Sequence, residues 1–428
     1  MLDRKFVIEN IELVEENCRH RGVTVDVRKL ADLEQQRRAK QIEAEDLNRQ
    51  ANEKSKLIGK AAEGAEREAL KEGARQLREQ KEQAAAEVDA LAAEADAILR
   101  VIPNLSHPAA PIGVDDKANL ELRKGKHQPP VFDFPVLDHV QLGERLDLFD
   151  FEAGGKVAGH GFYYLKNEAA QLELALQQYV LNLLVGEGFT PTITPDLARN
   201  EILQGIGFIP RGPETQIYSV ADTDLSLIAT AEITLGGWYA KETFDSDQLP
   251  LKLCGVSHCY RTEAGAHGAA TRGLYRVHQF TKVEMFAFTL PDESEEMLEY
   301  FCGLECRIFD ELGIPYRVVD TATGDLGGPA YRKYDLEAWM PGRGDGGEYG
   351  EVTSTSNCTE YQARRLAIRY RIKGEKGTHF VHTLNGTAVA ISRALIAILE
   401  NNQRADGSVA VPEVLQPLLG KDVIEPRK

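Results

Sequence analysis

Long apolar runs are missing from this sequence of 428 residues. No stretch approaches the roughly 18 consecutive apolar residues that a membrane-spanning helix needs. The start of the chain, MLDRKFVIEN, also lacks the apolar core of a secretory signal peptide. We therefore expect a protein that neither enters a membrane nor carries an export signal.

Cysteine is scarce, and it is not arranged as a framework. The chain has six cysteines, at Cys18, Cys254, Cys259, Cys302, Cys306 and Cys358. Such scattered thiols are typical of a reducing cytoplasm, whereas small secreted domains have dense disulfides. The pairs 254/259 and 302/306 have spacings that would suit a metal, but their apolar neighbours favour buried thiols over zinc ligands. The sequence therefore predicts a cytoplasmic protein.

An overall excess of positive charge is also missing, because the formal net charge is −17. Read over the whole chain, this balance argues against binding to nucleic acid. The charge is unevenly distributed, however. Between Arg37 and Glu82 the chain has twelve Lys or Arg against ten Asp or Glu, a local balance of about +2. An ordinary solvated helical surface with ion pairs would have the same composition, so charge alone leaves both interpretations open for this segment.

Proline and aromatic residues are absent between Val27 and Ile102, where alanine, leucine and charged residues dominate. This composition is typical of long helices. The second half has a seam that steps by four and three residues, as in helices that pack lengthwise; its positions are Leu70, Ala74, Leu77, Lys81, Ala84, Val88, Leu91, Ala95, Ile98 and Ile102. The first half has a poorer seam with basic residues in it, at Leu30, Leu33, Arg37, Lys40, Ala44, Leu47, Ala51, Lys54 and Ile58.

Two glycines, Gly59 and Gly64, mark a weak point between these halves where the chain can reverse. Pro103 and Pro108 end the second helix, since proline cannot continue one. We therefore predict an antiparallel two-helix coiled coil over about residues 27–102. Arms of 30 to 40 residues would reach roughly 45–60 Å at 1.5 Å per residue.

After about residue 105 the pattern changes to apolar strands, helices and glycine-rich turns. A chain of this length suits one large domain and one accessory domain. We predict an N-terminal domain over residues 1–104 that contains the hairpin, and a second domain over 105–428. The expected fold class is α+β, in which the second domain is built on a mixed, mainly antiparallel sheet flanked by helices.

One segment, RTEAGAHGAATRGLYRVHQFTKVE at residues 261–284, has the features of a nucleotide site. Arg261 and Glu263 precede a loop rich in glycine and alanine, and residues 275–280 are predicted to return as a strand with many hydrogen-bonding side chains. A guanidinium can hold a phosphate with two parallel hydrogen bonds, and Phe280 offers a flat face to a nucleobase. The alternative is a hairpin with a solvated polar face. The long loop disfavours it, because such turns need only about two to five residues.

This segment resembles motif 2 of the class II aminoacyl-tRNA synthetases, and its amino-acid sequence is similar to that of the seryl-tRNA synthetases in particular. Three other segments resemble further motifs of that family, in the expected order. Residues 188–197 resemble motif 1, residues 227–232 contain the TAE triplet of the serine pocket, and residues 383–401 resemble motif 3. Four motifs with the expected order and spacing make the resemblance specific.

The resemblance implies an enzyme that ligates L-serine to tRNA(Ser), and to tRNA(Sec) where that tRNA is present. Its substrate ATP, with Mg²⁺, would form a seryl adenylate before serine is transferred to the tRNA. The expected protein is a homodimer of the bacterial and eukaryotic type, without the zinc ligands of the archaeal form. Its helical arm and its motif 2 loop would contact the tRNA, mainly at phosphate and sugar because a helix surface cannot read the deep major groove of an RNA duplex.

The resemblance also assigns residues to the reaction. Catalysis would depend on Arg261, Arg393 and Glu351. Serine would be bound by Thr230, Ala231, Glu232, Arg261, Glu284, Asn385 and Thr387. ATP would be bound by Arg261, Thr262, Glu263, Val277, Phe280, Glu351, Val352, Thr353, Ser354 and Arg393, and Mg²⁺ by Glu351 and Ser354. The adenine is expected to lie between Phe280 and Arg393.

Some residues near these motifs keep an open interpretation. Arg276 and His278 flank the adenine-side positions and are either structural or functional. Lys282 receives no role, and Arg364 and Arg365 are expected to brace the site. The family usually has other residues at three places in this sequence, which are Thr262, Gly236–Gly237 and Gly205–Gly207.

Two alternative functions stay open. A paralogue that passes serine from its adenylate to a carrier protein or a biosynthetic pathway would share the active-site motifs, but relatives of that kind lack the long helical arm. A catalytically inactive RNA-binding relative would be expected to lose the arginines of motifs 2 and 3, whereas Arg261 and Arg393 are both present.

Overall fold

A computed structural model describes residues 1–208, 216–263 and 273–427 of the chain. The chain divides into two compact units, Met1–Leu105 and Ser106–Lys428. The centre of the predicted motif 2 loop, residues 264–272, lies outside the described residues.

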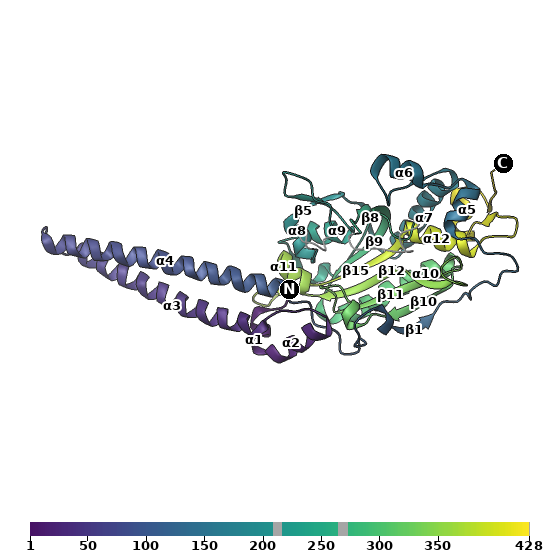
Figure 1. The fold of residues 1–428 in the computed structure, drawn as a ribbon. Coiled ribbons are helices and arrows are strands. Elements are labelled where there is room, and N and C mark those ends of the chain that lie inside the picture. Colours follow the sequence, from purple (N-terminus) through teal and green to yellow (C-terminus); the bar gives the residue numbers. More distant parts are fainter. Residues whose placement is uncertain (209–215, 264–272, 428) are drawn as a thin grey trace. The chain divides into compact units, whose positions relative to one another are not determined.

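The first unit is helical, and its two long helices form a hairpin (Figure 1). The side chain of Asp26 accepts a hydrogen bond from the backbone N–H of Lys29 and so caps the first long helix. Gly59 follows that helix, and Gly64 precedes the next with a φ of 151°, a conformation that favours glycine. The helices of this unit are α1 (Arg4–Glu9), α2 (Ile11–His20), α3 (Val27–Ile58) and α4 (Ala65–Val101).

The packing of α3 on α4 follows the seam in the sequence. Leu30 and Leu33 of α3 are buried, as are Leu77 and Val88 of α4. Near the end of α4 the buried residue is Leu99, whereas the heptad predicts Ile98. The period of 3.6 residues in a straight helix drifts against a repeat of 3.5, which accounts for this shift of one position.

Ion pairs across the hairpin show its antiparallel register. Lys29 of α3 pairs with Glu94 of α4 at 2.6 Å, and further along the arm Lys40 pairs with Glu87 at 2.8 Å. The lysine in the first-half seam therefore reaches a carboxylate on the facing helix, which explains why the poorer seam still packs.

The second unit is built on an eight-stranded sheet with the order β1-β10-β11-β12-β15-β9-β8-β4. Neighbouring strands are antiparallel except β4 and β8, which are parallel. The strands are β1 (Leu120–Lys124), β4 (Thr190–Ile193), β8 (Leu251–Tyr260), β9 (Gln279–Thr289), β10 (Tyr316–Asp320), β11 (Arg332–Met340), β12 (Glu348–Thr359) and β15 (His382–Ala390).

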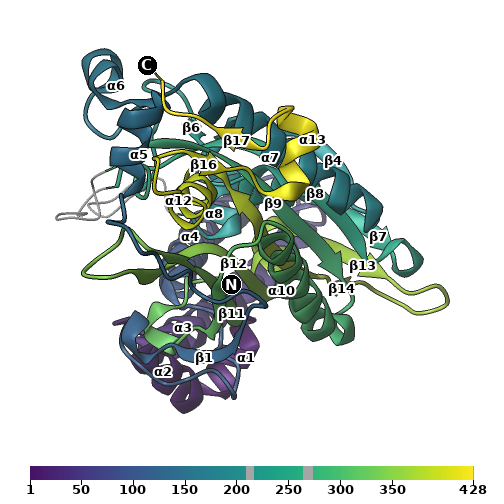
Figure 2. The same ribbon diagram turned by 90° about the vertical axis from the view of Figure 1, so that its right-hand side faces the viewer.

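Helices surround this sheet, as Figure 2 shows. They are α5 (His139–Leu146), α6 (Phe151–Ala158), α7 (Asn167–Gly186), α8 (Asn200–Ile206), α9 (Glu232–Trp238), α10 (Ser294–Glu311), α11 (Tyr361–Leu366), α12 (Ile391–Asn401) and α13 (Gln416–Leu419). Smaller sheets are made by β2 (Phe149–Asp150) with β3 (Tyr164–Leu165), β5 (Leu197–Arg199) with β6 (Leu225–Leu227), β7 (Thr243–Asp245) with β13 (Arg369–Arg371) and β14 (His379–Phe380), and β16 (Val409–Ala410) with β17 (Val423–Ile424).

The central strand β9 explains how the sheet makes room for a site. Its odd-numbered residues, such as Val283 and Met285, lie in the core with α7, α10 and α12. Because side chains alternate along a strand, its even-numbered residues face the other way. At the C-terminal end, Phe286 and Phe288 are covered by residues of α8, α9 and α11. The remaining part of that face carries polar residues and forms the floor of a pocket.

The structure confirms the α+β class, the mainly antiparallel sheet with flanking helices and the pair of long N-terminal helices. It corrects the predicted strand at 275–280, because β9 begins only at Gln279. The preceding backbone makes other bonds: Leu274 N–H donates to a histidine ring, and His278 N–H donates to the carbonyl of Gly161. None of the helices within the described ranges is long and apolar enough to cross a membrane.

Candidate active site

A pocket lies on the polar part of the sheet and draws most of its walls from three strands and one helix. Residues of β9, β12 and β15 line it, together with the start of α12 and the segment after β8. The lining residues are Phe208, Thr230, Glu232, Arg261, Glu263, Tyr275, Arg276, Val277, Phe280, Lys282, Glu284, Glu351, Val352, Thr353, Ser354, Asn385, Thr387, Ala390, Ser392 and Arg393.

One side of the pocket has arginines and an aromatic ring. The guanidinium of Arg261 lies 5.3 Å from the ring centroid of Phe280, and the backbone N–H of Arg261 donates to the carbonyl of His278 at 3.0 Å. Arg276 Nη1 lies 3.2 Å from Glu263 Oε2. Glu263 has a φ of 48°, in the left-handed region, so its carboxylate is presented from a sharp bend. Planar and cationic groups of this kind suit a nucleotide.

A buried ion pair lies deeper, on the floor. The side chains of Lys282 and Glu284 are only 7% and 2% exposed, and they pair directly. The Thr387 hydroxyl lies 3.4 Å from Lys282 Nζ and 3.5 Å from Glu284 Oε2. Burial raises the pKa of Glu284, although Lys282 acts in the opposite direction. Removing both charges from water is costly, so such a pair contributes little net stability and its retention points to a function.

A second carboxylate faces the same space. Glu232 Oε1 accepts hydrogen bonds from Gln362 Nε2 at 2.6 Å and from Asn385 Nδ2 at 3.0 Å. Gln362 is itself held by the Thr383 hydroxyl, which donates to its Oε1 at 2.7 Å. Burial raises the pKa of Glu232 to about 7, and the nearby charge of Glu284 adds to the effect. The site thus has two carboxyl groups, Glu284 buried and Glu232 half-buried, whose charged forms a bound cation would stabilise.

At the far wall, Arg393 of α12 meets β12. Arg393 Nη1 donates to the carbonyl of Glu351 at 2.9 Å and lies 3.4 Å from Glu351 Oε1. Its guanidinium is 4.7 Å from the ring centroid of Tyr275, whose hydroxyl also donates to the Glu351 carbonyl, at 3.3 Å. Burial acts to raise the pKa of Glu351, but Arg393, Lys333 and Arg261 outweigh it and lower that pKa.

The residues predicted for Mg²⁺ fit such an ion chemically. The Glu351 side chain is 44% exposed, so its carboxylate is accessible from the pocket. Ser354 offers a hydroxyl from the same strand, β12. Magnesium prefers oxygen ligands and is usually held by one or two carboxylates together with phosphate and water.

All of the site residues predicted from the sequence line this pocket except Ala231 and Thr262. Ala231 is fully buried, and its carbonyl accepts the backbone hydrogen bond of Leu235 in α9. The backbone N–H of Thr262 donates to the carbonyl of Gln216 at 3.0 Å. The sequence prediction thus assembles at one place, although its residues come from segments more than 100 positions apart.

Sequence reasoning left several lining residues without a role. The alternation of side chains along the strand could have identified Lys282, since it lies between Phe280 and Glu284 on the same face. Arg276 also lines the pocket, whereas His278 does not. No sequence pattern indicated that Tyr275 lines the pocket, because its position depends on a bend where a strand was predicted.

The two arginines expected to brace the site lie outside the pocket. Arg364 pairs with Glu360 at 2.7 Å, and Arg365 Nη1 donates to the carbonyl of Gln204 at 3.0 Å. They hold α11, the helix that carries Gln362. The brace nearest the site is therefore Gln362, for which no role was predicted.

Comparisons with known proteins agree with these motifs. The seryl-tRNA synthetase N-terminal domain family matches residues 1–106. The tRNA synthetase class II core domain family (G, H, P, S and T) matches residues 218–402.

Similar proteins cover the whole chain. A serine–tRNA ligase of Rhodopirellula baltica is 60% identical over 99% of this chain and 100% of its own length, and one of Rubrobacter xylanophilus is 54% identical over the full length of both. The crystal structure of seryl-tRNA synthetase from Pyrococcus horikoshii complexed with ATP has a TM-score of 0.92 at 40% identity and covers 100% of both chains. The cytoplasmic serine–tRNA ligase of Naegleria fowleri in complex with AMP has a TM-score of 0.85 at 34% identity, covering 98% of this chain and 96% of the other.

Proposed function

This chain belongs to the seryl-tRNA synthetases, the class II enzymes that use ATP to ligate serine to tRNA(Ser), and we propose that serine is activated in the pocket over β9 and β15. One observation carries the proposal. A single pocket combines a buried and a half-buried carboxyl group and a threonine hydroxyl on one side with arginines and an aromatic ring on the other. The first set suits the amine and hydroxyl of serine, and the second suits ATP.

Serine binds to the buried set. The Thr387 hydroxyl and the Glu284 carboxylate take the substrate hydroxyl, while Thr230 and Glu232 take the ammonium group. Asn385 supports Glu232 through the hydrogen bond at 3.0 Å, and Ala231 positions the turn between Thr230 and Glu232. Alanine is disfavoured because it would leave the buried partners of the hydroxyl unpaired.

Lys282 tunes this half of the pocket. Its ammonium lies beside both Glu284 and Thr387, so it favours the charged form of the Glu284 carboxylate and opposes the effect of burial, which raises the pKa of that group. A charged carboxylate is a stronger acceptor for the substrate hydroxyl than a neutral acid.

ATP binds to the arginine-rich set. Glu263 and Val277 fix the adenine, which stacks on Phe280, and Arg393 holds the γ-phosphate. Three further residues contribute to ATP binding through their neighbours in the sequence. Thr262 lies between Arg261 and Glu263, and Val352 and Thr353 lie between Glu351 and Ser354. The Arg261 guanidinium lies over the Phe280 ring, the face on which adenine would stack, so we expect it to move toward the α-phosphate when adenine binds.

The first chemical step joins two anions. A serine carboxylate oxygen attacks the α-phosphorus, the new O–P bond forms, and the bond to pyrophosphate breaks. Arg261 lies between carboxylate and α-phosphate and offsets their repulsion, so catalysis is mainly positioning and charge neutralisation. In the second step a ribose hydroxyl of the tRNA attacks the seryl carbonyl carbon, and AMP leaves.

Glu351 and Ser354 would hold Mg²⁺ in the ATP half of the pocket. The ion would supply positive charge that offsets the negative charge of the phosphates. Arg393 keeps the Glu351 carboxylate ionised, as the lowered pKa of that group indicates, so the ligand is available at neutral pH.

The tRNA is bound by the hairpin of α3 and α4 and by the motif 2 loop. The hairpin offers basic side chains along its outer part, where Arg49, Arg75 and others are exposed. Such contacts are mostly to phosphate and weaken steeply with salt. tRNA(Sec) would be bound in the same way where it is present.

The active form is a homodimer in the cytoplasm. Exposed apolar side chains lie on motif 1 and on the helix before it: Leu174 and Val185 of α7 are 67% and 49% exposed, and Ile193 at the end of β4 is 89% exposed. Surfaces of this kind favour association with a second copy. The thiols described above are free, as a reducing compartment requires.

ATP–pyrophosphate exchange across serine, threonine, alanine and cysteine tests the proposal. Exchange should depend on serine and should fall by orders of magnitude with the other three. Exchange with threonine equal to that with serine would contradict the assignment of the pocket.

A charging assay separates the two alternatives. Serine-dependent exchange without charging of tRNA(Ser) would indicate a paralogue that passes serine elsewhere. Absence of exchange, with tRNA(Ser) still bound, would indicate an inactive relative. We expect both exchange and charging.

A further inference from the structure

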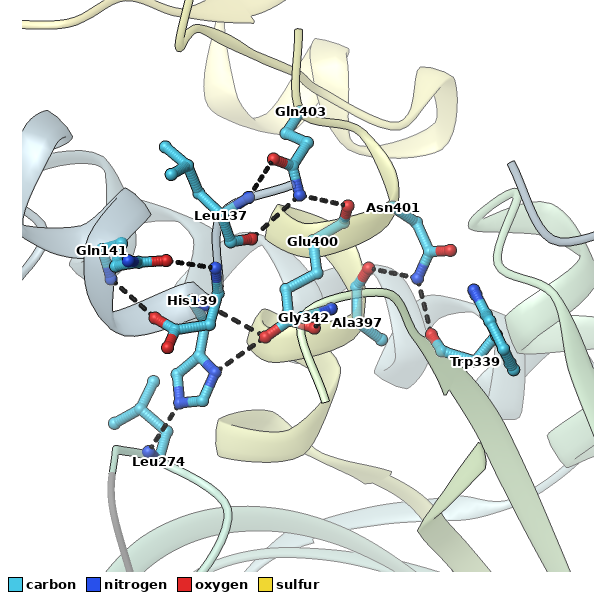
Figure 3. Close-up of polar contacts among 11 residues, drawn as sticks. Leu137, His139, Gln141, Leu274, Trp339, Gly342, Ala397, Glu400, Asn401 and Gln403 are labelled. Carbon is cyan, nitrogen blue, oxygen red and sulfur yellow. Dashed lines mark hydrogen bonds and ion pairs between the residues drawn. The ribbon is translucent and has the colours of Figure 1, made fainter. Parts of the chain in front are cut away.

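Glu400, near the C-terminal end of α12, is a buried carboxylate outside the pocket, only 2% exposed. Figure 3 shows that its two oxygens hold different segments of the chain. Oε1 accepts hydrogen bonds from the backbone N–H of His139 at 2.9 Å and from His139 Nδ1 at 2.8 Å. Oε2 accepts one from the backbone N–H of Gly342 at 2.9 Å. The carboxylate therefore ties the start of α5 and the turn after β11 to α12.

The imidazole of His139 extends this tie to a third segment. The backbone N–H of Leu274 lies 3.1 Å from His139 Nε2. Since a backbone N–H can only donate, Nε2 is the acceptor and the ring hydrogen is on Nδ1, where Glu400 accepts it. The orientation and tautomer of the ring are thus set by Glu400.

Both tied segments have glycine at the point of approach. A Cβ at position 273, next to Leu274, would lie 2.1 Å from His139 Nε2, and Gly273 has a φ of 79°. A Cβ at position 342 would lie 3.0 Å from the Glu400 carboxyl carbon and 2.6 Å from the Asp138 Cα. No side chain fits at either position, so the close approach of these two segments to the His139–Glu400 pair is built into the sequence.

The tied segments meet again at the edge of the pocket, where Tyr275 lines it and Arg343 lies just outside. Tyr275 follows Leu274, and Arg343 follows Gly342. The Arg343 guanidinium lies 4.4 Å from the Tyr275 ring centroid, and Arg393 lies 4.7 Å from the same ring. One carboxylate therefore sets the backbone on both sides of a stack that includes Arg393, seven residues before Glu400 on the same helix.

We propose that Glu400 and His139 are positioning residues for the ATP half of the pocket. They fix Leu274 and Gly342, and thereby hold Tyr275 and Arg343 where the Arg393 guanidinium needs them. Neither residue lines the pocket. The proposal rests on the proposed function, in which Arg393 holds the γ-phosphate, and it predicts an effect on ATP that is separate from any effect on serine.

Two substitutions of His139 distinguish its role in positioning Leu274 from its role as a hydrogen-bond donor to Glu400. In His139→Asn, the side-chain amide takes the place of Nδ1 and keeps the donor to Glu400, but the acceptor for Leu274 is lost. In His139→Gln, the longer side chain reaches the place of Nε2, and its oxygen accepts from Leu274 N–H, while the donor to Glu400 is lost.

Steady-state pyrophosphate exchange gives the readout, with the full-length protein and varied ATP or serine. His139→Asn should raise the KM for ATP about tenfold, as expected for one lost hydrogen bond to a buried group, and leave the KM for serine within about twofold. His139→Gln should keep the KM for ATP within about threefold of the wild type. If His139→Gln were as impaired as His139→Asn, or if both KM values rose together, the positioning role would be wrong.

A second variant and a control keep the test independent of folding. Glu400→Gln turns one acceptor oxygen into an N–H donor that faces Gly342 or His139, so it should raise the KM for ATP as well. Asn401→Ala is the matched control, because Asn401 ties the same end of α12 to the carbonyl of Trp339 at 2.7 Å but touches neither tied segment. It should lower the unfolding temperature without changing the KM for ATP; an equal rise would overturn the proposal.

The wild-type protein distinguishes this proposal from the function on which it rests. If the wild type showed no serine-dependent exchange, the proposed function would fail. If the wild type were active and the two His139 variants had equal KM values for ATP, only the positioning role would fail.

Discussion

The helical hairpin and the active-site pocket are both rich in charge, but they use it in opposite ways. In the hairpin, charged pairs lie in water: Arg49 and Asp46, three residues apart, are 62% and 46% exposed, and Lys40 and Glu87, on facing helices, are 37% and 41% exposed. In the pocket, Lys282 and Glu284 are almost inaccessible and contact Thr387 from another strand. Exposed pairs contribute little to stability, while buried pairs must offset a large desolvation cost. We propose that the hairpin's charges serve solubility and RNA contact, and that those of the pocket serve recognition of serine.

The largest effect should come from removing a charge on the pocket side. Arg261→Ala is expected to abolish serine-dependent pyrophosphate exchange while the fold stays intact, because this guanidinium contacts two anions that approach each other in the transition state. Circular dichroism and thermal unfolding would check the fold. Arg371→Ala, which removes an exposed pair with Asp245, is the control and should exchange at the wild-type rate. Near-normal pyrophosphate exchange by Arg261→Ala would contradict the claim that charges in the pocket matter more for activity than exposed surface charges.

The next effect belongs to the hairpin as a whole. Deleting about residues 30–100 and bridging the ends should remove tRNA charging but spare serine activation. The hairpin has its own seam and lies in a compact unit separate from the sheet. Comparing charging with pyrophosphate exchange in the same preparation is the measurement. Normal charging by the shortened protein would mean that the exposed charges of the arm do not bind tRNA.

The two regions also differ in how far the sequence predicts them. The hairpin follows from local rules: absence of proline, a seam with a helical period and two glycines between the helices. These rules fail only for small shifts in which residue is buried, such as Leu99 in place of Ile98. Such shifts depend on how the 3.6-residue period of a straight helix drifts against a heptad repeat.

The pocket is different, because residues far apart in sequence meet only through strand register. Thr387 reaches Glu284 because β15 pairs with β9 at those positions, which no local pattern contains. The resemblance to a family supplied the members of the site, but not Lys282, Gln362 or Tyr275. Tyr275 was missed because residues 275–278 bend away from the predicted strand in order to bond with neighbouring segments.

A third prediction tests the buried side of the comparison. Thr387→Ala and Glu284→Ala should each raise the KM for serine and narrow the preference for serine over alanine. Losing one hydrogen bond to a buried hydroxyl should cost on the order of 1–3 kcal/mol. The ratio of kcat/KM for serine and alanine is the quantity to measure. An unchanged ratio in both variants would place serine recognition elsewhere.

A fourth prediction uses pH. In the folded protein burial raises the pKa of Glu232 to about 7, from an ordinary value of 4.5. The folded state therefore binds this proton more tightly than the unfolded state, so the stability that the proton contributes is complete below pH 4.5 and is lost as the pH rises through 7.

Glu232→Gln removes this titration and keeps an oxygen that accepts from Gln362 and Asn385. Between about pH 5 and pH 8 the wild type should lose stability relative to the variant by on the order of 1–3 kcal/mol. Urea unfolding at several pH values without substrate measures the difference. Parallel pH profiles would show that the Glu232 carboxyl is not held in its neutral form.

The smallest effect is expected for an exposed charge of the hairpin. Lys40 pairs with Glu87 at 2.8 Å and with Glu43 at 3.0 Å, yet its side chain is 37% exposed. Water can replace these partners, so Lys40→Ala should change amide hydrogen exchange in α3 and α4 by no more than about twofold. Leu33→Ala is the contrasting variant, because Leu33 is buried in the same seam and a buried leucine truncated to alanine costs about 2–5 kcal/mol, or at least about thirtyfold faster exchange by local opening. If Lys40→Ala accelerated exchange as much as Leu33→Ala, the charges in the first-half seam would hold the hairpin together, and the division between a hairpin built on apolar packing and a pocket built on buried charge would no longer stand.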